Sequence, residues 1–193
     1  MNPTDHGVKS TIGTALILAG LLAAAAGAAG PVPPIKAGLW EVRMSTLDAD
    51  GRPMPAPGME GLANMPPEMR ARMEEALKAR GASLPDASGA IKTCLSKDQL
   101  STDRWQQQAA ESGCTTTYAS QSGSTWTWHS TCAGRFAAEA DGETTFTGTE
   151  AYRTKVVTTS TIRGKRTTTT RIVDGKFLSA DCGSIKPIQP PPR

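Results

Sequence analysis

The chain has 193 residues and a formal net charge of +3, so its basic and acidic side chains nearly balance. Its Lys and Arg residues are scattered among Thr, whereas a nucleic-acid-binding surface gathers them on one face, and we therefore expect no nucleic-acid partner. Residues 31–193 are poor in Leu, Ile, Val and Phe. The core must therefore be small and needs additional support, such as disulfides.

Residues 1–29 have the features of a secretory signal peptide. A polar start containing Lys9 precedes a run of Ala, Leu, Ile and Gly, which ends in small residues with A-x-A character. A membrane-spanning helix needs ~20 strongly apolar residues, and the end of this run consists of Ala and Gly instead. We predict Sec-type export with cleavage near residues 26–30, a periplasmic or secreted location, and no stable membrane anchor after cleavage.

The remaining chain, about 160 residues, has the length of one domain, which we place at residues 30–186. Residues 38–47 alternate apolar and polar side chains and predict a first strand. Trp40 and Val42 lie on one face of this strand, and Glu41 lies on the other.

Residues 52–90 are rich in Pro, Gly and Met and predict an insertion rather than a further part of the sheet. One helix is predicted within it, at about 66–80. Asn64 can cap the start of this helix, and Pro67 suits its first turn. Gly81 can end it.

The chain then returns to strand patterns. Residues 91–95 predict a short strand, and Ser96 with Gln99 has the form of a capping box that opens a short helix to about Gln108. From Cys114 onward, Thr-rich alternating runs are separated by pairs typical of hairpin turns. These turns are predicted at 122–123, 141–142, 163–165 and 174–175. The fold class is mainly β: a curved antiparallel up-and-down meander with one short helix, a Met/Pro-rich helical insertion and two disulfides.

Four cysteines follow the signal: Cys94, Cys114, Cys132 and Cys182. An even number in an exported chain predicts two disulfides. If 122–123 is a hairpin turn, Cys114 and Cys132 lie almost opposite each other and can pair. Cys94 and Cys182 remain as the second pair, which would tie the strand before the short helix to the last strand. The other two connectivities stay open.

Several short motifs occur in a specific order: KAGLWEV at 36–42, TCLSKD at 93–98, Cys114, Trp128 four residues before Cys132, and Asp181-Cys182. In this order they resemble a bacterial exported family catalogued as Domain of Unknown Function 3617, whose members open with PGLWEV and carry CLTPED. Ala37 stands where that family usually has Pro. The resemblance implies a small exported β-rich protein with no assigned activity, and it supplies no catalytic residues.

No catalytic residue is predicted. His129 is the single histidine after the signal, and it alternates away from Trp126 and Trp128 on its strand. A polar residue on the surface of a sheet is the simpler interpretation, because a nucleophile would need an activating base within reach. The nearby acids Glu139, Asp141, Glu143 and Glu150 are interpreted as solvated groups beside turns. We therefore expect a protein that is not an enzyme.

No cofactor is predicted, although the methionines offer one alternative. All six methionines after the signal fall between Met44 and Met73, and thioethers are soft ligands suited to Cu(I). Met65, Met69 and Met73 would be the ligands of such a site. Their four-residue spacing, continued by Leu77, equally predicts the apolar stripe of a helix packed against the core. We favour packing over copper.

Two further features could bind an envelope protein or a small apolar ligand. Trp126 and Trp128 share one face of a strand with Tyr118 on its neighbour, and these rings either line a concave face or form the core. The Met-lined helix at 66–80 could cover the sheet or meet a partner. The Pro-rich tail, 187–193, is expected to be extended and mostly unstructured. The sequence thus favours a non-enzymatic binding or structural module.

Overall fold

The computed structural model describes residues 32–55, 62, 64–100, 110, 112–133, 137–162 and 164–188. The predicted signal peptide lies outside these residues, as do Met59, most of the helix predicted up to Gln108, and residues 189–193 of the tail. Among the described residues, no helix combines the length and the hydropathy that a membrane span requires.

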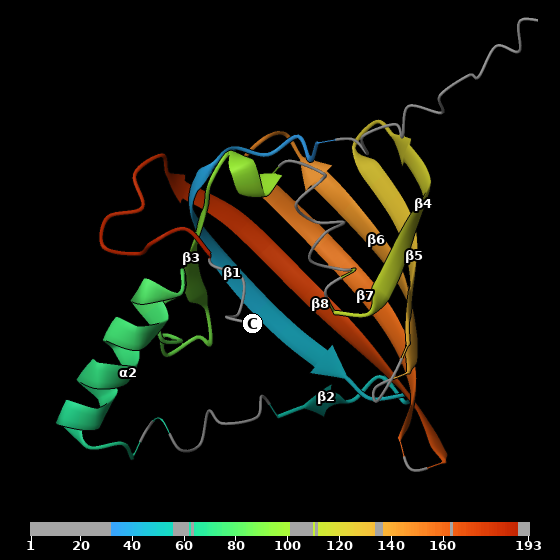
Figure 1. Ribbon diagram of the computed structural model, residues 1–193, viewed down its shortest axis with the longest axis horizontal. Coiled ribbons are helices and arrows are strands. Elements are labelled where there is room, and N and C mark those ends of the chain that lie inside the picture. The colour runs from blue at the N-terminus through green and yellow to red at the C-terminus, as the bar shows by residue number, and fades with distance from the viewer. Residues whose placement is uncertain are drawn as a thin grey trace, which may run out of the picture.

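The described residues form one antiparallel sheet of eight strands, in the order β2-β1-β8-β7-β6-β5-β4, with β3 beside β1. The strands are β1 (Gly38–Leu47), β2 (Pro53–Met54), β3 (Ile91–Leu95), β4 (Cys114–Ser122), β5 (Thr125–Cys132), β6 (Ala138–Thr147), β7 (Ala151–Ile162) and β8 (Lys165–Ser179). Strands β4 to β8 follow one another as a meander, and β8 then pairs with β1. Figure 1 shows that the sheet is strongly curved. The predicted mainly β meander is confirmed.

Two helical elements accompany the sheet. Helix α2 (Pro67–Ala79) begins after Pro66 without a side-chain cap, so the predicted capping role of Asn64 is wrong. Its end is as predicted: Gly81 adopts a φ of +94°, a value that favours glycine, and its amide donates to the carbonyl of Lys78. The 3-10 helix Asp98–Leu100 follows β3. The predicted capping box is present there, because Ser96 and Gln99 each accept the other's backbone amide.

The hairpin turns of the structure differ from the predicted ones at two places. Gly123 provides a predicted turn, with a φ of +62°. The predicted turns at 141–142 and 174–175 are wrong, because both pairs lie inside long strands, β6 and β8. Their glycines have a different function, which is to let aromatic rings lie against the backbone.

Trp128 lies across Gly142, its cross-strand partner, so closely that a Cβ at Gly142 would be 2.0 Å from the indole ring. Tyr152 covers its own partner Gly175 in the same way, at 2.2 Å. Glycine within a strand commonly marks such a close approach. The two ring–glycine pairs therefore explain why Asp-Gly does not form a turn in this protein.

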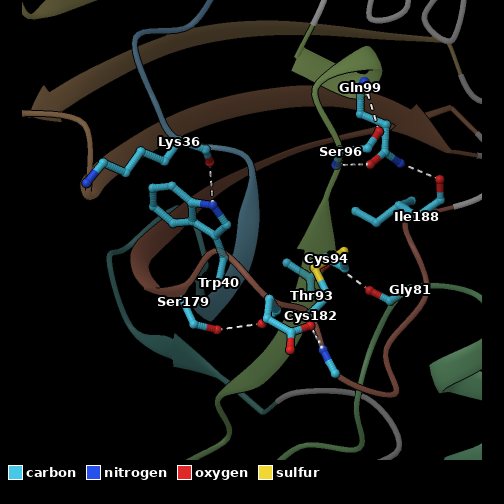
Figure 2. The surroundings of a disulfide bond; sticks show 12 residues. Lys36, Trp40, Gly81, Thr93, Cys94, Ser96, Gln99, Ser179, Cys182 and Ile188 are labelled. Carbon is cyan, nitrogen blue, oxygen red and sulfur yellow. Dashed lines mark hydrogen bonds between the residues drawn. A yellow bond between two sulfur atoms is a disulfide. The ribbon is translucent and has the colours of Figure 1, made fainter.

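The core lies on the face of the sheet that carries Trp40. This side chain has 0% exposure, and its indole N–H donates to the carbonyl of Lys36 over 2.9 Å (Figure 2). Its ring packs against Tyr152 and Phe177, with centroids 5.4 and 5.7 Å away. Leu100 of the 3-10 helix completes this cluster.

A second aromatic cluster lies further along the sheet on the same face. The ring of Trp126 contacts those of Tyr118 and Phe146 edge-on, at centroid distances of 6.3 and 5.0 Å. Trp126 and Phe146 are buried, and aromatic rings of this size supply apolar contact that few aliphatic residues provide in this chain.

The two disulfides join Cys114 to Cys132 and Cys94 to Cys182, the pairs that the hairpin spacing favours. One detail of the prediction is wrong: Cys182 lies beyond the end of β8, so its disulfide joins β3 to the segment after the last strand. The chain turns sharply there, since the amide of Gly183 donates to the side chain of Asp181.

Pro187 and Ile188, the first two residues of the Pro-rich tail, are held in place, although the tail 187–193 was expected to be mostly unstructured; residues 189–193 lie outside the described residues. Pro187 forms a parallel bridge with Cys94, and the amide of Ile188 donates to the Cys94 carbonyl over 3.2 Å. The side-chain amide of Gln99 donates to the carbonyl of Ile188 (Figure 2). This segment therefore joins β3 to the 3-10 helix.

Candidate functional site

Cross-strand register divides the sheet into two chemically different faces, because directly paired residues point to the same side. We call the face that carries Trp40 the inner face, since it lies toward the 3-10 helix inside the curve of the sheet (Figure 1). Five neighbouring strands, in the order β1, β8, β7, β6 and β5, contribute side chains to this face. In addition to Trp40, they are Val42, Met44, Thr46, Thr169, Arg171, Val173, Phe177, Tyr152, Thr154, Val156, Thr158, Gly142, Thr144, Phe146, Trp126 and Trp128. We call the opposite side the outer face.

The aromatic residues predicted to share one face do share it. Tyr118, Trp126 and Trp128 all point inward, and Trp126 is buried while the other two are half-buried. Burial raises the pKa of the Tyr118 phenol above its ordinary value, and it raises the pKa of Tyr152 in the same direction. Of the three rings on β4 and β5, Trp126 therefore belongs to the core, whereas Tyr118 and Trp128 are partly accessible to solvent.

The inner face is open near the edge formed by β1 and β2. Met44 is 54% exposed, Val173 beside it is half-buried, and Met54 of β2 lies on the same face opposite Thr46. One step further along the strands, Arg171 is exposed and Val156 is half-buried. We call this set the inner patch: Met44, Met54, Val156, Arg171 and Val173.

Sequence reasoning missed Arg171 and Val173 as site residues. The sequence did not indicate to which face of β8 these two side chains point. Four consecutive threonines at 167–170 hide the alternation of apolar and polar side chains on this strand. The alternation of Trp40, Val42 and Met44 on β1, together with antiparallel pairing, could have placed them.

The outer face carries charged side chains, several of which form ion pairs with one another. Arg153 contacts Asp174 over 2.9 Å, and Arg43 contacts Glu41 over 3.2 Å. Glu41, Arg43 and Asp174 also line a shallow hollow of about 310 Å³ on this face. Gly175 and Lys176 complete its lining. Its two acids and two bases offset one another, so the hollow selects no ligand charge. Exposed pairs of this kind contribute about 0–1 kcal/mol to stability.

His129 points to the outer face, as its alternation predicts. Its Nδ1 lies 2.8 Å from Asp141 Oδ1, and its Nε2 lies 3.3 Å from Thr131 Oγ1. Hydrolases use a hydroxyl, an imidazole and a carboxylate in this order. Here β5 is paired on both sides, with β4 and β6, so its amide groups are used in the sheet instead of forming an oxyanion hole.

The acids near His129 are arranged differently from the prediction. Glu139, Asp141 and Glu143 lie within β6 on its outer face rather than beside turns. Glu150 does lie in a turn, where it pairs with Lys36. Within the described ranges, no cluster of His, Cys, Asp and Glu side chains could hold a metal ion.

The methionine stripe of α2 does not pack against the core. No residue of the helix is buried, and Met69 and Met73 are 56% and 36% exposed. The packing interpretation is therefore wrong, because the residues that form the core cluster with Trp40 come from β1, β3 and the 3-10 helix and none comes from α2. Met65, just before the helix, is half-buried.

Comparison with known proteins identifies relatives but no activity. The family described as "Protein of unknown function (DUF3617)" matches residues 35–182. An uncharacterized protein encoded in the lpd-3 5′ region of Pseudomonas putida is 33% identical over 131 residues, which cover 65% of this chain and 89% of that protein. No solved structure matches. The chain belongs to the DUF3617 family of proteins of unknown function.

Proposed function

We propose that this protein is an exported, non-enzymatic binding module whose inner patch holds an apolar ligand. The observation that carries the proposal is the exposure of Met44 beside the half-buried Val173 and Val156, on a face whose remaining apolar side chains form the core. Small-molecule sites are mostly apolar, with a few placed polar groups. Methionine suits such a site because its side chain is flexible and polarizable.

Two features support export. The first 29 residues have the features of a signal peptide, and all four cysteines form disulfides. Disulfides persist in oxidising compartments such as the periplasm. A periplasmic or secreted binding protein is consistent with both observations.

Binding of a neutral fluorescent hydrophobe, N-phenyl-1-naphthylamine, tests the proposed function. The wild-type protein should raise its fluorescence in a saturable way, and Met44→Glu should abolish the effect because it places a charge in the inner patch. Ser45→Glu is the matched control, since Ser45 is the next residue on β1 and points to the outer face.

The control variant should bind as the wild type does. The proposal is wrong if the wild type shows no saturable binding, or if Met44→Glu and Ser45→Glu, both with the wild-type circular dichroism spectrum, bind the probe equally well.

Cu(I) binding through Met65, Met69 and Met73 is a second candidate function. The observation that favours it is that α2 leaves Met69 and Met73 exposed one helical turn apart, because burial in the core would have made them unavailable. Thioethers are suited to Cu(I).

Replacing Met65, Met69 and Met73 together by Leu separates the two functions. If the methionines bind copper, the variant should lose Cu(I) affinity in a competition assay with a chromophoric chelator, while the inner patch still binds the neutral hydrophobe. Met44→Leu with Met54→Leu is the matched control. Unchanged Cu(I) affinity in the triple variant excludes this site.

A further inference from the structure

We infer that the ligand of the inner patch is a long-chain carboxylate whose head group is bound by Arg171; this inference rests on the proposed function. Arg171 lies on β8, between Thr46 of β1 and Val156 of β7, with its side chain on the inner face. It is exposed, while Val156 and Val173 beside it are half-buried. A cation is thus placed beside the partly exposed apolar side chains of the inner patch.

The other charged side chains near Arg171 have the opposite orientation. Along the described strands, the acids lie on the outer face: Glu41, Asp174, Glu139, Asp141 and Glu143. Arg43 and Arg153 pair with acids there, but no acid of the described residues pairs with Arg171. Lys165 is the other basic residue of β8 whose position in the alternation puts it on the inner face, and it lies at the tip of the β7–β8 hairpin. On the described strands, the inner face therefore carries positive charge with no compensating carboxylate.

An anion is the ligand that such a face complements. Arginine presents a planar fork of donors that binds a carboxylate through two parallel hydrogen bonds. Arg171 itself is exposed, but an apolar chain lying over the neighbouring methionine and valine side chains would displace water there and so strengthen the interaction. An inorganic anion alone would not use the apolar surface, so the ligand combines an anionic head with an apolar chain.

The sheet register gives the direction of the apolar chain. Arg171 pairs with Val156, Val156 pairs with Gly142, and Gly142 pairs with Trp128. This row crosses three inter-strand spacings, a path of roughly 14 Å along the sheet. A single acyl chain that starts at Arg171 can therefore lie over Val156 and end at the half-buried ring of Trp128.

Decanoate and decanol, which share a chain length and differ in charge, test this assignment. Each displaces N-phenyl-1-naphthylamine from the wild type, from Arg171→Gln and from Arg166→Gln. Arg166 is the matched control because it is an exposed arginine on the outer face of the same strand. Arg171→Gln should weaken decanoate binding about tenfold or more, with decanol unchanged, and Arg166→Gln should change neither.

The outcomes separate the inference from the proposed function. If decanoate binds wild type and Arg171→Gln equally while both compounds still displace the probe, the carboxylate assignment is wrong and the apolar site stands. If decanol and decanoate bind the wild type with equal affinity, Arg171 does not recognise the head group. If neither compound nor the probe binds, both proposals fail.

Discussion

At the scale of single residues, the shape of the inner face depends on two glycines that lie beneath aromatic rings. Gly142→Ala would place a Cβ against the indole of Trp128, and such overpacking should lower the free energy of unfolding by roughly 1–3 kcal/mol. The measurement is urea unfolding followed by circular dichroism.

The double variant Gly142→Ala with Trp128→Leu provides the control. If the clash with the ring causes the loss, the double variant should be more stable than the sum of the two single effects allows. Additive effects would show that Gly142 is required for another reason.

The two half-buried tyrosines predict a dependence of stability on alkaline pH. Burial raises the pKa of Tyr152 and of Tyr118 in the folded state, so the folded protein retains phenol protons that the unfolded chain loses near pH 10. Their contribution is complete below pH 10 and is lost as the pH rises through the folded pKa. Unfolding free energies measured from pH 8 to 11 should fall above pH 10.

Tyr152→Phe identifies the group responsible. This variant should show a shallower fall above pH 10 than the wild type, and absorbance at 295 nm should report one late-titrating phenol fewer. A fall of the same steepness in both proteins would contradict the assignment to Tyr152.

At the scale of elements, the two disulfides should contribute unequally. The Cys94–Cys182 bond spans a sequence separation of 88 residues, and Cys114–Cys132 spans 18. Each disulfide lowers the conformational entropy of the unfolded chain, and the effect grows with loop length. It should stabilise the fold by about 5 kcal/mol for Cys94–Cys182 and by about 3 kcal/mol for Cys114–Cys132. Replacing Cys94 and Cys182 by Ala should lower the urea midpoint more than replacing Cys114 and Cys132. The reverse order would show that loop length does not dominate.

Helix α2 should contribute little to the stability of the sheet, because none of its residues is buried. Replacing Met69 and Met73 by Gln should change the free energy of unfolding by less than about 0.5 kcal/mol. Trp40→Ala, in the core, should cost about 3–5 kcal/mol. A large loss in the α2 variant would mean that the helix packs against the domain in solution.

At the scale of the whole molecule, alternation predicted the meander, and cysteine spacing favoured the two disulfides that the structure contains without excluding the other pairings. Alternation on β1 placed Trp40 and Val42 on one face, and the structure shows that this face is the buried one. The Asp-Gly pairs misled because turn preference is local, whereas the positions of Gly142 and Gly175 are determined by rings on neighbouring strands. A helical stripe likewise indicates an apolar face but not what covers it, which is why the packing of α2 was predicted wrongly.

The candidate site could be predicted only in part. The sequence identified aromatic residues that share one face, but Arg171 was hidden by a run of identical Thr side chains. Its importance depends on the absence of acids from the inner face of the described strands, and that feature emerges only when register brings β1, β6, β7 and β8 together.

Native mass spectrometry of the protein released gently from its own cell envelope tests the central claim most directly. We expect a chain that has lost its first 26–30 residues, retains both disulfides, and carries an adduct that dissociates as a long-chain carboxylate. Ser45→Glu should keep this adduct, and Met44→Glu should lose it. A wild-type protein without any bound molecule, or an adduct retained in full by Met44→Glu, would contradict the proposal that the inner patch is a binding site.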